Sequence, residues 1–508
     1  MTYSQLLAGA AILCAVASAV PAPAPTAKPQ PVADAQQPQV TPFRVQNEPT
    51  RVLFEPTTTL AIYRRDNILS KIESGVGGVL SKLGIPNFFQ DFPTGDKVQS
   101  SLGIDDAQLA ALPTQVLNLP PYGNWTDQGW QIRFHGNVYK QPNTNLTTLN
   151  KLANIFVPGD FNQLQPSEQD QARNLTAEIF VVQQANVSVT MHLEPAPPSG
   201  NQTGGVTAPG GSQDITLPYN TTAEGDFDNF TPIKMNGLLP GNQTAEIQKL
   251  NVYATGATLG NATAYLVPPT GYTVISDIDD ILRVTKIYQP KEGLLNSFAR
   301  PFASWLNMPD IYANWSNTVP NLHFHYLTTT PEQVTRNYMD YIFKTYPLGS
   351  FDTRPLNFSD IAATLSIRKF LLTKIFETFP QRKFILVADT SNSDVMKDYP
   401  LMATTYPNQV QCIFLRNTSA TDDDKFPYDT SGFKGINQTK YMFFIQPDDL
   451  MNLNIAGGNC YNSTIKQNVT FGLQDELLGI HGSSASTLAT SSSSALIAFI
   501  VAALFLIT

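Results

Sequence analysis

The second half of the chain alternates short apolar runs with longer segments in which apolar residues recur at helical spacing. The apolar runs cover residues 272–276, 322–327, 383–388, 410–415 and 441–445. Between them, helical spacing occurs at residues 331–346, 361–379 and 393–405. Such alternation is typical of β-α-β units, which build a parallel sheet with helices on both faces. We therefore predict an α/β domain over residues 270–472.

Residues 114–269 show a different pattern, in which short stretches of alternating apolar and polar residues are separated by Gly-, Pro- and Asn-rich turns. Clear stretches are WQIRFHGNVY at 130–139, AEIFVVQQANVSVTMHL at 177–193 and ATAYLVPP at 262–269. Alternation with a period of two is typical of strands, and regular turns between short strands favour a β-sandwich. We predict a β-rich, sandwich-like domain here and interpret His135 and His192 as structural residues.

The N-terminal segments are predicted to have other roles. Residues 1–19 combine an apolar stretch, Leu6–Val16, with an Ala-Ser-Ala cleavage pattern, which is typical of a secretory signal peptide. Residues 20–50 are rich in Pro, Ala and Gln and read as a linker. Residues 51–113 contain patches of helical spacing, which we interpret as a helical adaptor segment.

Residues 473–508 resemble the signal for a glycosylphosphatidylinositol (GPI) anchor. Small residues at 482–486 are followed by a Ser-rich spacer and by the uncharged apolar tail Ala495–Thr508. A membrane-spanning helix needs about 20 apolar residues, more than this tail offers. We therefore expect a secreted protein, GPI-anchored at the cell surface to the plasma membrane or cell wall.

Composition agrees with an extracellular setting and excludes one class of partner. The net charge is −9 and no cluster of Lys and Arg occurs, so we expect no binding to nucleic acid. Many Asn-x-Ser/Thr sequons predict a glycoprotein. They begin at Asn124, Asn145, Asn174, Asn186, Asn201, Asn220, Asn229, Asn242, Asn261, Asn314, Asn357, Asn417, Asn437, Asn462 and Asn468. Cys412 and Cys460 either form a disulfide or remain two separate buried thiols.

Three carboxylates follow the first apolar run of the α/β segment: Asp277, Asp279 and Asp280. Ligands of α/β sheets bind at the carboxyl ends of strands, where these acids are expected. Like charges so close together raise one another's pKa unless a cation joins them, and hard oxygen ligands favour Mg²⁺. An acidic turn or a structural Ca²⁺ loop would also fit this stretch alone.

Two later strand runs also end in residues suited to phosphoryl transfer. Residues 322–327 lead to Thr328, and residues 383–388 lead to Asp389, with Asp394 five positions later. Polar residues that converge from separate strand ends are a more specific signal than one acidic pair.

These motifs resemble the haloacid dehalogenase superfamily, and within it the phosphatidate phosphatase family first associated with actin patches. The stretch DIDDI is similar to the family's D-x-D-x-T, HYLTTTPEQ to its second motif, and ADTSNSD to its last motif. The resemblance covers about residues 270–450 and implies a Rossmann-like fold. It also assigns a basic residue on a helix to Lys369, or to Arg368 if the register shifts by one.

The resemblance implies a Mg²⁺-dependent phosphatase whose substrate is a phospholipid phosphomonoester. Catalysis would fall to Asp277, Asp279, Thr328 and Lys369, and the metal to Asp277, Asp279, Asp389 and Asp394. Asp277 would attack phosphorus, Asp279 would act as general acid and base, and Thr328 and Lys369 would stabilise phosphoryl oxygens.

The chain departs from the family pattern at several positions. Ile281 replaces a hydroxyl residue, Thr329 and Glu332 replace an Asn and an aromatic residue, and Ala388 replaces a Gly. Two other functions therefore stay open: a cell-surface binding scaffold that has lost activity, and an extracellular phosphatase of broad specificity.

Overall fold

A computed structural model describes residues 50–51, 95–196, 212–354, 367–421, 428–467 and 469–474. The predicted signal peptide, nearly all of the linker, most of the adaptor segment and nearly all of the predicted anchor signal lie outside these residues. Within the described ranges, no helix has the length and apolar character needed to cross a membrane.

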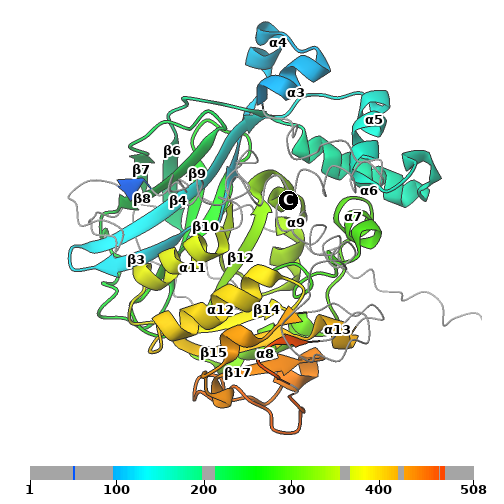
Figure 1. Cartoon of the computed structure of the whole chain (residues 1–508). Coiled ribbons are helices and arrows are strands. Elements are labelled where there is room, and N and C mark those ends of the chain that lie inside the picture. Colours follow the sequence, from blue (N-terminus) through cyan, green and yellow to red (C-terminus); the bar gives the residue numbers. More distant parts are fainter. Residues whose placement is uncertain are drawn as a thin grey trace, which may run out of the picture.

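The C-terminal half forms a parallel sheet of six strands, as the sequence predicts (Figure 1). Its strands are β11 (Tyr272–Ser276), β12 (His323–Pro331), β13 (Ser350–Arg354), β14 (Lys383–Asp389), β15 (Val410–Arg416) and β17 (Tyr441–Phe444). The spatial order is β13-β12-β11-β14-β15-β17, and all neighbouring strands are parallel. The five predicted apolar runs are all strands, whereas β13 was not predicted.

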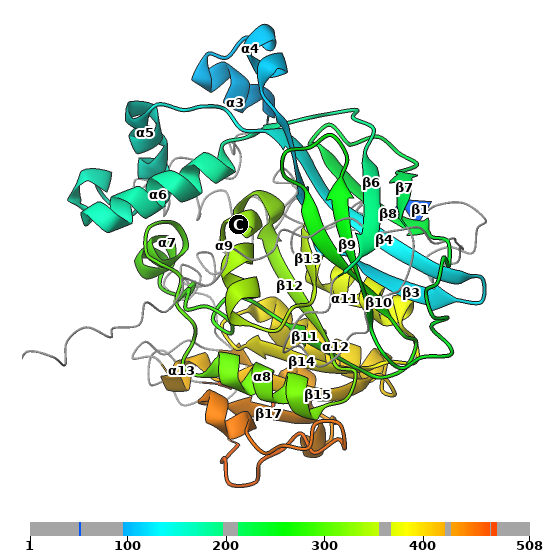
Figure 2. The ribbon, with the colours of Figure 1, turned by 180° about the vertical axis from the view of Figure 1, so that it is seen from behind.

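Helices cover both faces of this sheet. Helices α8 (Met308–Thr318) and α9 (Glu332–Thr345) pack on one face, and α11 (Ile367–Thr378) and α12 (Ser393–Thr405) pack on the other. Figures 1 and 2, which show opposite sides of the molecule, each bring one of these pairs to the front. Successive strand residues therefore enter different cores, as Val274 and Ile275 do.

The order of the strands determines where polar side chains gather. Numbered along the chain, the six strands run 3-2-1-4-5-6 across the sheet, so the first strand, β11, lies beside the fourth, β14. Doubly wound sheets bind ligands outside the carboxyl ends of the strands where the order reverses. Asp277 directly follows β11 and Asp389 ends β14, so both lie at this point of the sheet.

The region before the parallel sheet contains ten strands that form one hydrogen-bonded sheet (Figure 2). They are β1 (Thr50–Arg51), β2 (Thr114–Asn118), β3 (Tyr122–Thr126), β4 (Gly129–Lys140), β5 (Val182–Gln183), β6 (Thr190–Pro195), β7 (Gln213–Thr216), β8 (Asp226–Pro232), β9 (Gln248–Ala254) and β10 (Asn261–Val267). The β-rich character is as predicted. The described strands are continuous through β4, which pairs with β8 on one side and with β3 and β2 on the other, so they differ from a sandwich of two separate sheets.

Helices interrupt this region where strands were expected. Helix α5 (Leu146–Phe156) and helix α6 (Pro166–Ile179) lie between β4 and β5. The predicted strand stretch at residues 177–193 therefore begins with the last turn of α6. Pro166 at the first helical turn and the capping box between Gln165 and Glu168 begin this helix, and they outweigh the strand-like alternation at its end.

The remaining described elements are short. They are α3 (Gly95–Leu102), α4 (Asp106–Ala111), α7 (Pro290–Phe298), α13 (Thr418–Thr421), β16 (Tyr428–Asp429), β18 (Leu473–Gln474) and the 3₁₀ helices η2 (Phe161–Gln163), η3 (Ser431–Phe433), η4 (Gln438–Lys440) and η5 (Pro447–Leu450).

A buried ion cluster connects the two sheets. Asp352 on β13 lies 2.9 Å from Nη1 of Arg133 on β4 and 3.5 Å from Nζ of Lys374 on α11, and Arg133 also pairs with Asp228 on β8. Burial alone would raise the pKa of Asp352, but Arg133 and Lys374 outweigh it and hold that pKa well below its usual range. Asp352 therefore links the β-rich region to α11, the helix that carries Arg368.

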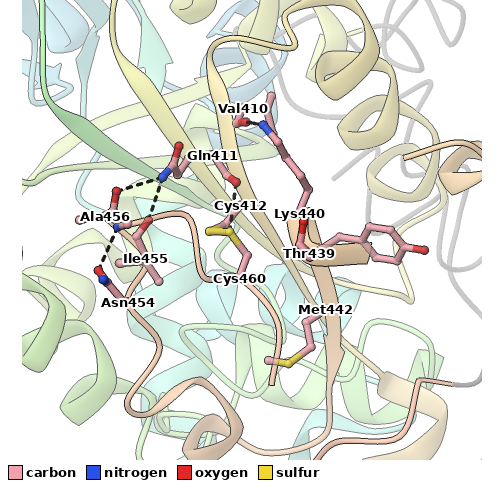
Figure 3. Close-up of a disulfide and its surroundings, with 12 residues drawn as sticks. Val410, Gln411, Cys412, Thr439, Lys440, Met442, Asn454, Ile455, Ala456 and Cys460 are labelled. Atoms are coloured by element: carbon pink, nitrogen blue, oxygen red, sulfur yellow. Dashed lines mark hydrogen bonds between the residues drawn. A yellow bond between two sulfur atoms is a disulfide. The ribbon is translucent and has the colours of Figure 1, made fainter. Parts of the chain in front are cut away.

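Cys412 and Cys460 form a disulfide, which decides between the two alternatives left open by the sequence (Figure 3). Cys412 lies on β15, and the bond closes a loop with a sequence separation of 48 residues. Nearby, the side chain of Gln411 donates hydrogen bonds to the carbonyls of Ile455 and Ala456, at 3.2 and 3.0 Å. These contacts fix the segment after β17 against the sheet.

Candidate active site

Asp277 is buried, with 3% of its surface exposed, at the end of β11. Its backbone nitrogen donates to the carbonyl of Val387 on β14 at 2.8 Å, so the strand pairing continues through this residue. One side-chain oxygen, Oδ1, accepts from the backbone nitrogen of Ile278 at 2.9 Å. The carboxylate is therefore held in a fixed position at the switch point of the sheet, which is the place between β11 and β14 where the strand order reverses.

Arg368, rather than Lys369, is the basic residue beside Asp277. Its Nη2 lies 3.1 Å from Oδ2 of Asp277, and its side chain is 1% exposed. Lys369 is exposed on the surface of α11. Neighbouring residues on a helix point about 100° apart, so only one of the two can face the sheet. Of the two alternatives left by the sequence, Arg368 is the one at the site.

Asp279 lies two residues beyond Asp277 and is held by a different arginine. Arg283 approaches its Oδ1 with Nε at 3.0 Å and Nη2 at 2.8 Å, and the hydroxyl of Thr285 donates to the same oxygen at 2.7 Å. Oδ2 is approached by the hydroxyl of Thr330, at the end of β12, at 3.5 Å. Among the described residues, Oδ1 of Asp279 therefore has three close donor atoms, whereas Oδ2 has one donor at the limit of hydrogen-bonding distance.

Asp280 forms the turn that follows. It adopts a left-handed backbone conformation, with φ of 58°, and its carboxylate accepts from the backbone nitrogens of Thr285, Lys286 and Ile287 at 2.8 to 3.3 Å. Asp280 is fully buried, and Arg416 at the end of β15 lies 3.7 Å from its Oδ1. These contacts indicate that Asp280 shapes the loop that carries Asp279.

Asp389, Asp394 and Thr328 complete the set of predicted residues. Asp389 is buried and accepts from the backbone nitrogen of Ser391 at 2.7 Å and from the hydroxyl of Thr418 at 3.1 Å. Asp394 is in the first turn of α12, where the positive charge of Arg368 acts on it. Thr328 is buried on β12, and its hydroxyl accepts from the backbone nitrogen of Thr330 at 3.1 Å.

Burial raises the pKa of the carboxyl groups of Asp277 and Asp389. It raises the pKa of Asp277 to about 6, against the opposing effect of Arg368 and with help from Asp279. Burial also raises the pKa of Asp389, although Ser391 opposes it, and the negative charge of Asp277 adds to the increase. Acidic groups that raise one another's pKa would be stabilised by a cation placed between them.

Magnesium, which the resemblance implies, fits part of the predicted ligand set. No three His, Cys, Asp or Glu side chains are arranged to hold a metal anywhere in the described part of the chain. The four predicted ligands therefore do not form one cluster, and Asp279 is paired with Arg283 instead. Asp277 and Asp389 suit Mg²⁺, which is often bound by one or two carboxylates together with substrate phosphate and water.

Sequence reasoning missed several residues that contact the site. Arg283 and Arg416 each pair with a carboxylate of residues 277–280, the DIDD stretch, and the hydroxyl of Thr418 donates to Asp389. A weak signal existed for Arg416, since a charged residue ends the apolar run VQCIFLR. Arg283 lies four residues after Asp279, a spacing at which two side chains can form an ion pair, but it falls outside the DIDDI motif.

Comparisons with known proteins agree with this geometry. Residues 272–417 match the family model described as phosphatidate phosphatase APP1, catalytic domain. This segment is similar to the catalytic domain of that family. The resemblance inferred from the motifs is confirmed by this match. The matched segment contains Asp277, Asp279, Arg368 and Asp389.

One curated relative is the phosphatidate phosphatase APP1 of Saccharomyces cerevisiae, which is 28% identical over 180 residues. The alignment covers 34% of this chain and 30% of the relative. The chain thus spans less than a third of the length of the curated relative it matches.

Proposed function

We propose that this protein is a Mg²⁺-dependent phosphatase of the haloacid dehalogenase type that converts phosphatidate to diacylglycerol and phosphate. The observation that carries the proposal is the environment of Asp277. This carboxylate is buried where the strand order of the sheet reverses, with Arg368 beside it and Asp389 at the end of the neighbouring strand. Such an environment suits a nucleophile that must approach a phosphate. The family match over residues 272–417 supports the choice of substrate.

In the first step, Asp277 attacks phosphorus and forms an aspartyl-phosphate. The bond between phosphorus and the glycerol oxygen breaks, and the electron pair stays with that oxygen, which takes a proton from Asp279. Arg368 stabilises the charge on the phosphoryl group and on Asp277, as cations do in a water-poor site. Diacylglycerol leaves.

In the second step, water hydrolyses the aspartyl-phosphate. Asp279, now ionised, takes a proton from the water, whose oxygen attacks phosphorus while the bond to Asp277 breaks. Phosphate leaves, and Asp277 is again a carboxylate and Asp279 an acid. Asp277 and Asp389 would hold Mg²⁺, whose positive charge would lower the repulsion between the carboxylates and the phosphate.

The departures from the family pattern have structural roles that leave the acids in position. Ile281 is fully buried in the core beside Ile278 and Leu282. The carbonyl of Thr329 accepts from Nε of Arg354 at 2.8 Å, and Glu332 contacts Asp226 of the β-rich region. These features favour an enzyme over an inactive scaffold.

We also propose that the protein is secreted and glycosylated, and that a GPI anchor holds it at the outer membrane surface. The disulfide supports an oxidising compartment, because such bonds are rare in the cytosol. An anchored enzyme would meet phosphatidate in the membrane to which it is attached.

The test measures phosphate release from phosphatidate in mixed micelles by the purified wild-type protein and by Asp277→Asn. We expect release that needs Mg²⁺, is abolished by EDTA, and falls by at least about 10³-fold in the variant, because the nucleophile is lost. Wild-type protein without metal-dependent release would refute the proposal and favour the scaffold. Equal turnover of soluble phosphate esters would instead favour a broad-specificity phosphatase.

A further inference from the structure

The two oxygens of Asp279 have very different surroundings. Oδ1 accepts hydrogen bonds from Nε of Arg283 at 3.0 Å and from the hydroxyl of Thr285 at 2.7 Å, and Nη2 of Arg283 lies 2.8 Å from the same oxygen. Oδ2 has only the Thr330 hydroxyl near it among the described residues, at 3.5 Å. A carboxyl oxygen with three donors cannot carry a proton as well, so the proton of the acid form belongs on Oδ2.

Arg283 is itself held in a fixed position. Its guanidinium lies over the ring of Tyr338 on α9, at 4.2 Å from the centroid, and over the ring of Phe302, at 5.3 Å. The residue is 3% exposed, so its contact with Asp279 is shielded from water. Rings from two separate segments therefore orient the arginine, and the arginine in turn orients the carboxyl group.

Among the described residues, one nitrogen of Arg283 is left unpaired. Nη1 of Arg283 is buried and has no hydrogen-bond partner within the ranges that the structure describes. Buried donors are normally satisfied, although Nη1 of Arg133 in the buried ion cluster also lacks a hydrogen bond within those ranges. Within this part of the chain, the guanidinium therefore has an unused donor beside Asp279, while its Nε and Nη2 hold Oδ1.

We propose that Arg283, together with Thr285, is a positioning residue that fixes Asp279 so that Oδ2 presents its proton to the leaving oxygen of the substrate. This inference rests on the proposed phosphatase function. When Asp279 gives up the proton, the charge that appears on its carboxylate is stabilised by the guanidinium already bound to Oδ1. Arg283 thus acts on the step in which the glycerol oxygen departs, and it does so through Asp279.

The decisive comparison uses two substrates that differ in one atom. The first is phosphatidate. The second is an analogue in which sulfur replaces the oxygen between glycerol and phosphorus, because a thiolate leaves without needing a proton. For Arg283→Gln we expect kcat on phosphatidate to fall about 10²-fold, within the range of general acid catalysis, and kcat on the sulfur analogue to fall less than about threefold.

A double-mutant cycle provides the second measurement. Asp279→Asn combined with Arg283→Gln should be no slower on phosphatidate than Asp279→Asn alone, because the arginine acts through that carboxyl group. Arg283→Lys, which keeps the charge, should recover part of kcat. Thr285→Val, which keeps the shape of the side chain, should show the same substrate dependence with a smaller loss of kcat.

The matched control is Arg173→Gln. Arg173 is an arginine on α6 that also pairs with an acid, Asp170, and lies over the ring of Phe161.

Two outcomes would overturn the inference, and they differ from failure of the proposed function. Equal losses on both substrates, or additive losses in the cycle, would mean that Arg283 only stabilises the loop. A folded wild-type protein that releases phosphate from neither substrate would refute the phosphatase function itself and the inference with it.

Discussion

At the scale of single residues, the DIDD stretch shows how three carboxylates are accommodated within four positions. The sequence alone suggests that a divalent cation relieves their repulsion. The structure instead gives each acid its own arginine: Asp277 has Arg368, Asp279 has Arg283 and Asp280 has Arg416. Arg368 and Arg416 lie far along the chain from the acids. No local pattern could therefore have revealed these two pairs, although the acids were predicted and the family resemblance offered Arg368 as an alternative to Lys369.

The partner of the nucleophile gives a prediction that separates Arg368 from Lys369. Arg368→Gln removes the charge that lowers the pKa of Asp277, which burial raises to about 6. Because Asp277 must be ionised to attack, kcat/KM should fall on the order of 10²-fold, and the acidic limb of the pH–rate profile should move to higher pH. Both effects are measured by phosphate release between pH 4.5 and pH 8.

Lys369→Gln serves as the comparison, since it removes one positive charge from the next position of the same helix. We expect its kcat/KM to stay within about twofold of the wild-type value, as for other exposed substitutions. A large loss in Lys369→Gln, with Arg368→Gln nearly unchanged, would reverse the assignment made from the structure.

At the scale of elements, the sequence predicts what depends on local pattern and fails where distant contacts decide. The apolar run at 272–276 has the boundaries of β11, and the segment with helical spacing at 393–405 has the boundaries of α12. Strand β13, with sequence SFDTR, was missed because its polar residues looked like a loop. Asp352 in this strand can be buried only because Arg133 and Lys374, from other elements, neutralise it.

The disulfide provides a prediction at the same scale. Replacing both Cys412 and Cys460 with Ala opens a loop with a sequence separation of 48 residues, and the unfolded chain gains entropy. The free energy of unfolding should fall by about 2–4 kcal/mol, and thermal unfolding monitored by circular dichroism should occur at lower temperature. The wild-type protein should shift in the same direction on reduction, while the variant should not respond to reductant.

The result that would contradict this prediction is an equal response to reductant in both proteins. Activity offers a further check, because Cys412 lies on β15, the strand that ends at Arg416. At temperatures well below unfolding, kcat should be nearly unchanged in the variant, since the bond stabilises the segment after β17 rather than the catalytic side chains.

At the scale of the whole molecule, the β-rich region and the parallel sheet share a buried polar contact surface. The edge strand β13 is covered there, with the backbone nitrogen of Phe351 donating to the carbonyl of Pro120 at 3.1 Å. The sequence predicted a β-rich region and an α/β region, but not this contact. His135, interpreted from the sequence as structural, lies in this contact surface, with its Nε2 2.8 Å from the carbonyl oxygen of Phe351.

A pair of acids in this contact surface makes stability depend on pH. Asp226 on β8 and Glu332, the first residue of α9, are both buried and hydrogen-bond each other. Burial raises the pKa of Asp226 to about 6 and that of Glu332 well above its usual value. The folded protein therefore holds protons on this pair that the unfolded chain releases above about pH 4, so the pair contributes most to stability at low pH and its contribution declines as pH rises through 6.

Glu332→Gln tests this relation, because Gln keeps the shape and a hydrogen-bond donor but cannot ionise. When the pH is raised from 5 to 8, the free energy of unfolding measured with urea should fall by about 2 kcal/mol more in the wild-type protein than in the variant. Other buried acids, such as Asp277 and Asp389, act in the same direction in both proteins and cancel in the comparison. Asp310→Asn, at an exposed acid on α8, is the matched control and should parallel the wild type. If Glu332→Gln also parallels the wild type, the pair shares no proton and the two regions are joined mainly by the cluster around Asp352.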